Sequence, residues 1–193
     1  MIIVYAVLAY FIGSIPSGLI IGKTFFNTDV RQYGSKNIGA TNTYRVIGLK
    51  AALPVFLCDA LKGAAGVVLL SSYGPMYMIL GGILAMMGHN WSIFLGFKGG
   101  RGVATGLGVL IALSPLVALL CFLVWGIIVY FTKLVSLGSI VAAALVPVLM
   151  YVTGESYWFV GFGGLAALFV IVRHWDNIKR LVVGAQPLLL NPF

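Results

Sequence analysis

Residues 103–132 read VATGLGVLIALSPLVALLCFLVWGIIVYFT, a run without a charged side chain. As one helix this run would be about 45 Å long, whereas the hydrocarbon core of a bilayer is about 30 Å thick. Ser114-Pro115 divides it, and a proline inside an apolar run ends one helix or begins the next. We therefore expect two membrane helices here, of which the first, 103–113, is half-length or strongly tilted.

The basic residues around this run support its division. Further apolar runs cover about 1–22, 51–73, 75–97, 134–152 and 157–172. A single crossing by 103–132 would place Lys133 and the C-terminal basic cluster outside, although Lys and Arg are enriched in cytoplasmic loops. Two crossings place every Lys and Arg except Lys62 on the cytoplasmic side. The sequence therefore predicts an all-α integral membrane protein with seven transmembrane helices, the N-terminus outside, the C-terminus cytoplasmic, and one domain over 1–193.

The composition excludes a soluble globular domain. Of 193 residues, 61% are hydrophobic and 8% are charged, and 12 Lys and Arg against 4 Asp and Glu give a net charge of +8. Soluble domains are about half apolar and about a quarter charged. Cys58 and Cys121 lie in apolar runs without a zinc-ligand spacing, so we expect no metal site and no disulfide framework.

The first polar constellation is GSKNIGATNTYR at 34–45, in the first cytoplasmic loop. Small residues allow a ligand to approach the backbone closely, and the Ser, Asn, Thr, Lys and Arg side chains supply donors for an anion. The competing interpretation is a capped amphipathic helix at the membrane surface, with Ser35 or Asn37 as its N-cap. Composition alone leaves both interpretations open.

The second constellation is GFKGGRGVAT at 96–105, directly before the short helix. Glycines interleaved with Lys98 and Arg101 and opening into a helix N-terminus are typical of a phosphate-binding loop. The spacing does not match a Walker loop. A turn at the membrane edge needs fewer glycines and cations, so anion binding is the favoured interpretation.

The third constellation is RHWDNIKR at 173–180, at the cytoplasmic end of the last span. His174 and Asn177 are three residues apart and would share a helix face that points inward. An ordinary basic segment with Trp175 as an interfacial anchor is the alternative. Within the second span, Asp59 and Lys62 also have a three-residue spacing, which permits an ion pair with either a functional or a structural role.

Two classes of function compete for this pattern. A transporter needs polar residues at several depths and access from both sides, whereas this chain has one charged pair in its spans and few polar residues outside. An enzyme that acts from the cytoplasmic face on an anionic, partly lipidic substrate fits better. The sequence carries no metalloprotease motif and no nucleotide loop.

Together these motifs closely resemble those of the bacterial acyl-phosphate:glycerol-3-phosphate acyltransferases, integral membrane enzymes that make lysophosphatidic acid in phospholipid synthesis. The resemblance covers most of the chain, through 13–16, 34–42, 59–63, 88–105 and 174–184. The chain departs from the family pattern at Arg101, where Lys is common, at Gln186, where Glu is common, and at Trp91-Ser92, where Phe-Pro is usual.

The resemblance implies a set of site residues. Those expected to be catalytic are Ser35, Arg45, Arg101, His174 and Asn177. Those expected to bind substrate phosphate are Lys36, Asn37, Thr41, Asn42, Lys98, Gly99, Gly100 and Gly102. The implied substrates are acyl phosphate and glycerol 3-phosphate, with membrane lipid around the protein. No metal, cofactor, nucleic acid or obligate protein partner is expected, and the implied location is the bacterial plasma (inner) membrane, with the active site facing the cytoplasm.

The implied reaction suits these residues, because an acyl phosphate is a mixed anhydride with a good leaving group. The enzyme then has to hold two anions together and orient a hydroxyl group. His174 or the substrate's own phosphate would accept the proton. The sequence shows no activated serine dyad, so we expect direct transfer rather than an acyl-Ser35 intermediate.

Overall fold

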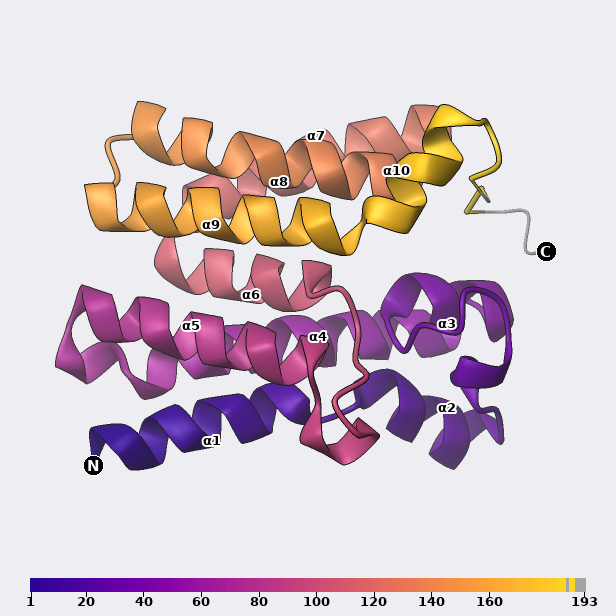
Figure 1. Ribbon diagram of the computed structural model, residues 1–193, viewed down its shortest axis with the longest axis horizontal. Coiled ribbons are helices and arrows are strands. Elements are labelled where there is room, and N and C mark those ends of the chain that lie inside the picture. Colours follow the sequence, from indigo (N-terminus) through magenta and orange to yellow (C-terminus); the bar gives the residue numbers. More distant parts are fainter. Residues whose placement is uncertain (187, 190–193) are drawn as a thin grey trace.

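The computed structural model describes residues 1–186, 188 and 189, and every regular element in this part of the chain is a helix (Figure 1). The α-helices are α1 (Ile2–Ser14), α2 (Ser17–Phe26), α3 (Ala40–Val46), α4 (Leu49–Leu69), α5 (Pro75–Asn90), α6 (Val103–Leu113), α7 (Pro115–Thr132), α8 (Val135–Val152), α9 (Tyr157–Arg173) and α10 (Trp175–Val182). The 3-10 helices are η1 (Val30–Gln32), η2 (Ser71–Tyr73) and η3 (Ile93–Leu95).

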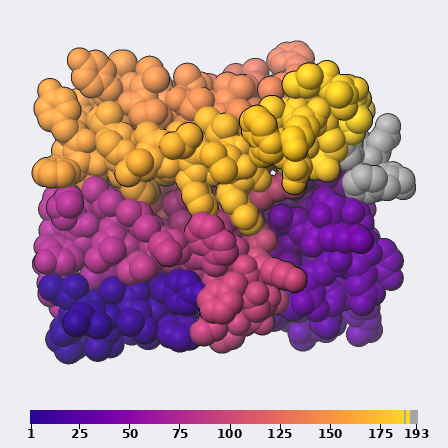
Figure 2. Space-filling model, viewed as in Figure 1, coloured from indigo at the N-terminus to yellow at the C-terminus, as the bar shows by residue number. Residues whose placement is uncertain are grey.

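The helices form two layers, which Figures 1 and 2 show one above the other. One layer holds α1 to α5, the other holds α7 to α10, and α6 lies between them. Gly63 on α4 faces the backbone of Thr105 on α6, and Gly108 on α6 faces the backbone of Ala60 on α4, so closely that a Cβ at either glycine would overlap it. Small residues that bring helix backbones into contact are the usual packing device in membranes.

The first apolar run is not one straight helix. α1 and α2 meet at Ile15-Pro16 with a bend of 45°, as expected from the proline near the end of this run. The break frees backbone carbonyl groups, and the buried Lys62 of α4 donates a hydrogen bond to the carbonyl of Ile15 at 2.9 Å. Lys62 therefore stabilises the bend, and this explains one of the two charges predicted inside the membrane.

The break at Ser114-Pro115 lies where the sequence predicts it. α6 ends at Leu113, α7 begins at Pro115, and the hydroxyl of Ser114 donates to the carboxylate of Glu155 in the connection between α8 and α9. α6 has 11 residues, or about 16 Å of helix, which is shorter than the hydrocarbon core.

The chain is an all-helical, multi-pass integral membrane protein. By length and composition, four helices in the described residues are able to cross a membrane, or up to six if α1 with α2 and α9 with α10 each count as one bent span. The short α6 is not in this count. Seven crossings with the N-terminus outside therefore stay a prediction.

Candidate active site

The three polar constellations meet around one pocket between the two layers, which we name the central pocket. Figure 1 shows α3, α10 and the N-terminal end of α6 converging on this region, and α6 begins well inside the molecule. The predicted site residues that line the central pocket are Ser35, Asn37, Thr41, Asn42, Arg45, Arg101, Gly102, His174 and Asn177. Those that do not line it are Lys36, Lys98, Gly99 and Gly100.

Asn42 organises the first polar loop. Its side chain is buried, and its Oδ1 accepts a hydrogen bond from the N–H of Ser35 at 2.8 Å. Its Nδ2 donates to the carbonyls of Val30 and Asn37, both at 2.9 Å. These bonds occupy the amide group, so Asn42 holds the loop that presents Ser35. In this structure Asn42 acts as a positioning residue, and its role as a phosphate ligand stays a prediction.

The first loop ends in a short helix, but neither predicted N-cap begins it. α3 starts at Ala40 with Gly39 as its N-cap, and Asn37 instead accepts a hydrogen bond from the N–H of Gly39 at 2.8 Å. Lys36 is exposed and has a positive φ of 57°. The loop therefore turns Ser35 and Asn37 into the central pocket and Lys36 away from it.

Two arginines supply the positive charge of the central pocket. Burial, together with the positive charges of Arg180 and Arg173, lowers the pKa of Arg101 to about 10. Burial and the charge of Arg180 also lower the pKa of Arg45. A guanidinium group stays protonated at neutral pH despite such shifts. Arg45 and Arg101 thus lie close enough to Arg173 and Arg180 for their charges to repel one another. A bound anion would relieve that repulsion.

The glycine loop packs on the end of α5. The N–H of Gly99 donates to the carbonyl of Asn90 at 3.1 Å, and the N–H of Gly100 donates to the carbonyl of His89 at 3.0 Å. A Cβ on Gly100 would overlap the His89 ring, at 2.8 Å from Cε1. These two glycines are therefore needed for close packing, and their N–H groups are already paired. Their paired N–H groups give no support to direct phosphate binding, which stays a prediction, and Lys98 is exposed beside them.

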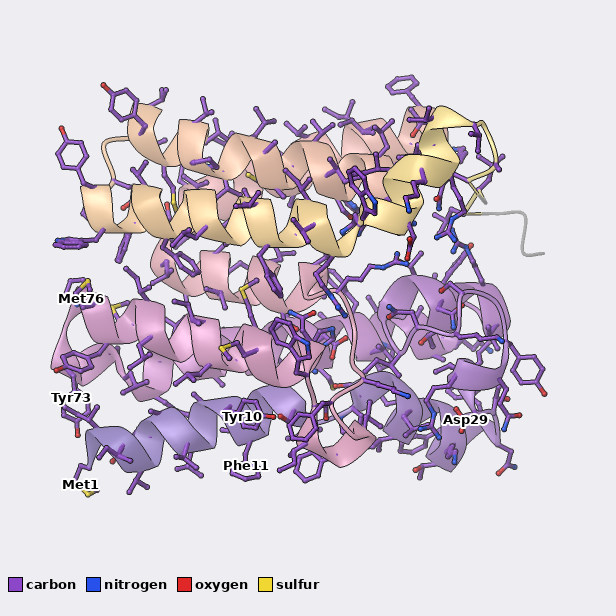
Figure 3. The ribbon with its side chains drawn as sticks, in the orientation of Figure 1. Met1, Tyr10, Phe11, Asp29, Tyr73 and Met76 are labelled. Atoms are coloured by element: carbon purple, nitrogen blue, oxygen red, sulfur yellow. The ribbon has the colours of Figure 1, made fainter. Side chains whose placement is uncertain are left out.

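The same loop is fixed from its other side. Arg173 donates to the carbonyl of Gly100 at 2.9 Å, and its guanidinium lies 5.9 Å from the centre of the Trp91 ring. Figure 3 shows Tyr10 directed toward this loop, and its hydroxyl donates to the carbonyl of Trp91 at 2.8 Å. Trp91, where the chain departs from the family pattern, thus takes part in the packing of this loop.

The beginning of α6, where the glycine loop ends, has the geometry of a phosphate-binding site. Gly102 has a φ of 79°, which favours glycine, and caps the helix. Gly102, Val103 and Ala104 line the central pocket. The N–H groups of Val103 and Ala104 belong to the first turn and have no acceptor among the described residues. Such N–H groups and the helix dipole favour a negative charge.

His174 lies in the turn between α9 and α10 and is buried. Burial lowers its pKa to about 4; the hydrogen bond to the carbonyl of Val170 opposes this effect, and the charges of Arg101 and Arg173 add to it. Its Nδ1 lies 2.8 Å from that carbonyl oxygen. Because a carbonyl only accepts, the neutral ring carries its hydrogen on Nδ1, and Nε2 keeps a free lone pair.

Asp59 is a pocket carboxylate that sequence reasoning did not place in the site. It lines the central pocket and forms a buried ion pair with Lys62 at 2.7 Å, while Nδ1 of His89 lies 3.7 Å from it. Asp29 and Asp176 do not line the pocket. Asp29, labelled in Figure 3, is bound to Arg31 at 2.7 Å, and this hydrogen bond lowers its pKa.

The central pocket continues as an apolar channel between α6, α7, α8 and α9. Its walls carry mostly small or aliphatic side chains on one face of each helix. They include Leu107, Leu110, Cys121, Phe122, Trp125, Ser139, Ala142, Ala143, Val146, Phe162, Gly163, Ala166, Ala167 and Val170. In the sequence, only the repeated small residues of α8 and α9 gave a signal for the channel.

A pocket that is cationic at one end and apolar along the rest, in an integral membrane protein, has the polarity of an amphiphilic anion. The family model described as glycerol-3-phosphate acyltransferase matches residues 3–184. Glycerol-3-phosphate acyltransferase of Fusobacterium nucleatum is 45% identical over 184 residues, which cover 94% of this chain and 95% of that protein. Glycerol-3-phosphate acyltransferase 2 of Moorella thermoacetica is 46% identical over 181 residues, which cover 93% of each.

Two crystal structures of PlsY, an integral membrane glycerol 3-phosphate acyltransferase, have the same fold. The glycerol 3-phosphate form is 37% identical with a TM-score of 0.91, and the lysophosphatidic acid form is 36% identical with a TM-score of 0.89. Each alignment covers 97% of this chain and 94% of the PlsY chain. The chain therefore belongs to the glycerol-3-phosphate acyltransferase family, whose members are integral membrane enzymes of phospholipid synthesis. Within that family it is of the PlsY type.

Proposed function

We propose that this protein transfers a fatty acyl group from acyl phosphate to the sn-1 hydroxyl of glycerol 3-phosphate. The new ester bond forms as the carbonyl–phosphate bond breaks, and the products are lysophosphatidic acid and inorganic phosphate. The observation that carries the proposal is the gathering of Arg45 and Arg101, with Arg173 and Arg180 behind them, at the mouth of an apolar channel. The two PlsY forms, with substrate and product, support it.

Each part of the central pocket has a matching part of the reactants. The apolar channel suits the acyl chain, and the arginines with the first turn of α6 suit the two phosphates. Electrostatic stabilisation of the leaving phosphate and orientation of the attacking hydroxyl are then the main contributions of the protein. The mixed anhydride supplies the driving force, so the reaction as written needs neither a metal nor a cofactor.

The geometry favours His174 as acceptor of the hydroxyl proton. Its Nδ1–H is held by the carbonyl of Val170, its Nε2 is free, and the ring is neutral at physiological pH. The leaving phosphate is the other group that would accept the proton. Loss of the imidazole reduces the rate strongly in the first case and weakly in the second.

Direct transfer is favoured over an acyl-enzyme. A serine nucleophile needs a neighbouring base, whereas the N–H of Ser35 is bound to the Asn42 amide and its loop contributes donors. Ser35 then acts as a hydrogen-bond donor to the acyl phosphate. Incubation with labelled acyl phosphate in the absence of glycerol 3-phosphate tests this, because a stoichiometric acyl-protein would require the covalent route.

We further propose that the central pocket faces the cytoplasm of a bacterial plasma membrane. The connections with most of the Lys and Arg residues would then obey the tendency for positive charge to stay inside. Cysteine labelling at Lys133 tests this orientation in a variant in which the free Cys58 and Cys121 are replaced by alanine. Labelling from the periplasmic side alone would overturn it.

Purified protein with glycerol 3-phosphate and one of three acyl donors tests the reaction as a whole. The donors are acyl phosphate, acyl-CoA and acyl-carrier protein with the same chain. Acyl phosphate alone is expected to give lysophosphatidic acid. Equal or faster transfer from a thioester would overturn the proposed donor but not the membership of the family.

A further inference from the structure

The 45° bend between α1 and α2 leaves a buried backbone carbonyl that needs a donor. Pro16 has no N–H and interrupts the helix, so carbonyl groups at the bend lose their usual helical partners. No backbone N–H among the described residues donates to the carbonyl of Ser14 across the break. Ser14 is buried, and a buried carbonyl without a partner is costly, so another part of the fold has to supply the hydrogen bond.

Ser92 supplies it from the segment that follows α5. Its hydroxyl donates to the carbonyl of Ser14 at 2.5 Å, and only 1% of its surface is exposed. The carbonyl of Ser92 in turn accepts a hydrogen bond from the N–H of Phe97, in the glycine loop, at 2.8 Å. Ser92 therefore connects the bend to the glycine loop. Proline, which is usual at this position in the family, has no such donor, so the connection is a feature of this chain.

The other side of the bend supports the first polar loop. On α2, Gly18 faces the carbonyl of Ile38 so closely that a Cβ at this glycine would overlap it. Ile38 follows Asn37, which lines the central pocket and whose side chain accepts a hydrogen bond from the N–H of Gly39. A change in the direction of α2 therefore moves the loop that presents Ser35 and Asn37.

We infer that Ser92 is a positioning residue, which fixes the separation between the first polar loop and the glycine loop by bonding to the α1–α2 bend. The inference rests on the proposed function in that the first polar loop and the start of α6, where the glycine loop ends, hold the two reactants. Reacting groups have to approach within about 3–3.5 Å, so the rate depends steeply on this separation.

Loss of the Ser92 hydroxyl should change the separation of the loops without unfolding either. The Asn42 amide still holds the first polar loop, and the carbonyls at the end of α5 still accept the hydrogen bonds of the glycine loop. Lys62 still donates to the carbonyl of Ile15, so the bend itself persists. Ser92→Ala is therefore expected to fold with two intact loops that no longer keep a fixed distance.

A distance measurement between two spin labels tests this without an activity assay. The labels are attached to Lys36→Cys and Lys98→Cys, which are exposed positions on the two loops, in protein with Cys58 and Cys121 replaced by alanine. Ser92→Ala should shift or broaden the distribution of distances between the labels. An unchanged distribution would overturn the inference.

Two further variants serve as controls for the distance measurement. Ser71→Ala is matched, because its hydroxyl also donates to a backbone carbonyl, that of Val68 at 2.8 Å, but lies in η2 at the opposite end of α5. It should leave the distribution unchanged. Ser92→Thr keeps the hydroxyl and should preserve the wild-type distances. A change in Ser92→Thr as large as that in Ser92→Ala would contradict a role of the hydrogen bond.

Steady-state kinetics show whether the separation matters for the reaction. Ser92→Ala should lower kcat roughly 10- to 100-fold, while the KM for glycerol 3-phosphate changes less than about threefold, because each loop still binds. In a Ser35→Ala background the same substitution should cost less, since a group that the first loop brings to the reaction is already missing. An equal factor in both backgrounds, or a normal kcat, would overturn the inference.

These measurements separate the inference from the proposed function. The label distances need no substrate, and the kinetic ratios use whichever acyl donor is active, so a wrong donor would change neither. The thermal midpoint in detergent reports whether each variant folds. Because Lys62 still holds the bend, a Ser92→Ala variant that fails to fold would also contradict the inference.

Discussion

Replacement of Gly100 by alanine tests the packing of the glycine loop. Gly100 does not have a positive φ, so alanine fits the backbone and only its methyl group causes strain. The methyl would overlap the His89 ring, with Cε1 at 2.8 Å and Cδ2 at 3.0 Å. That ring is buried and cannot swing into solvent. Adding a methyl to a close-packed site costs about 1–3 kcal/mol.

The strain should appear both in stability and in substrate binding. If the loop gives way, Arg101 beside it moves from the position it has in the central pocket. A loss of about 1.4 kcal/mol in binding of glycerol 3-phosphate raises its KM roughly tenfold, whereas kcat should fall less. Steady-state kinetics in detergent with both substrates varied, and the thermal midpoint, measure the two effects.

The controls use the chain's own glycines and the His89 ring. Gly126→Ala in α7 is the matched control, because a Cβ there meets nothing within 4 Å. In a His89→Ala background the added methyl has room, so the cost of Gly100→Ala should shrink, as a double-mutant cycle would show. Identical behaviour of the two glycine variants, or strictly additive effects with His89→Ala, would refute the packing argument.

Three further predictions follow from other parts of the site. Ser35→Ala should lower kcat roughly 100- to 1,000-fold, the loss expected for one hydrogen-bond donor, and wild-type protein should accumulate no acyl group; a trapped acyl-Ser35 would contradict this. His174→Gln should lower kcat by about 100-fold or more. Because the pKa of His174 is lowered to about 4, the pH–rate profile of the wild type should show loss of the proton-accepting form only as pH falls through that value. A variant with near-normal kcat would assign the proton to the leaving phosphate. Lys62→Met should destabilise the fold by about 3–5 kcal/mol by leaving Asp59 buried without its partner, and adding Asp59→Asn should recover part of the thermal midpoint; no recovery would mean that the ion pair is not the cause.

The arrangement of helices was largely predictable from the sequence. The proline inside the apolar run 103–132 located the break at Ser114-Pro115, because a proline cannot continue the backbone hydrogen-bond pattern of a helix. The number of crossings was less predictable. An 11-residue helix such as α6 is able to lie within a membrane without spanning it, and sequence does not distinguish the two.

The polar loops were predictable as a group but not residue by residue. A glycine N–H is the same in sequence whether it faces a phosphate or a carbonyl, and only the fold shows that Gly99 and Gly100 face the end of α5. Likewise, only the fold shows that the Asn42 amide donates hydrogen bonds to backbone carbonyls of its own loop. The apolar channel escaped prediction because lipid and protein interior are equally apolar, so hydropathy does not show which face of α8 or α9 lines a cavity.

The stoichiometry of the two products tests the central claim most directly. Purified protein in detergent is given acyl phosphate and glycerol 3-phosphate, and lysophosphatidic acid and inorganic phosphate are followed in the same reaction, with Arg101→Gln as the inactive control. The account predicts that both products appear together in equal amounts, and that neither forms faster than the background without glycerol 3-phosphate. Phosphate release without lysophosphatidic acid, or formation of lysophosphatidic acid from a thioester donor at an equal or faster rate, would contradict it.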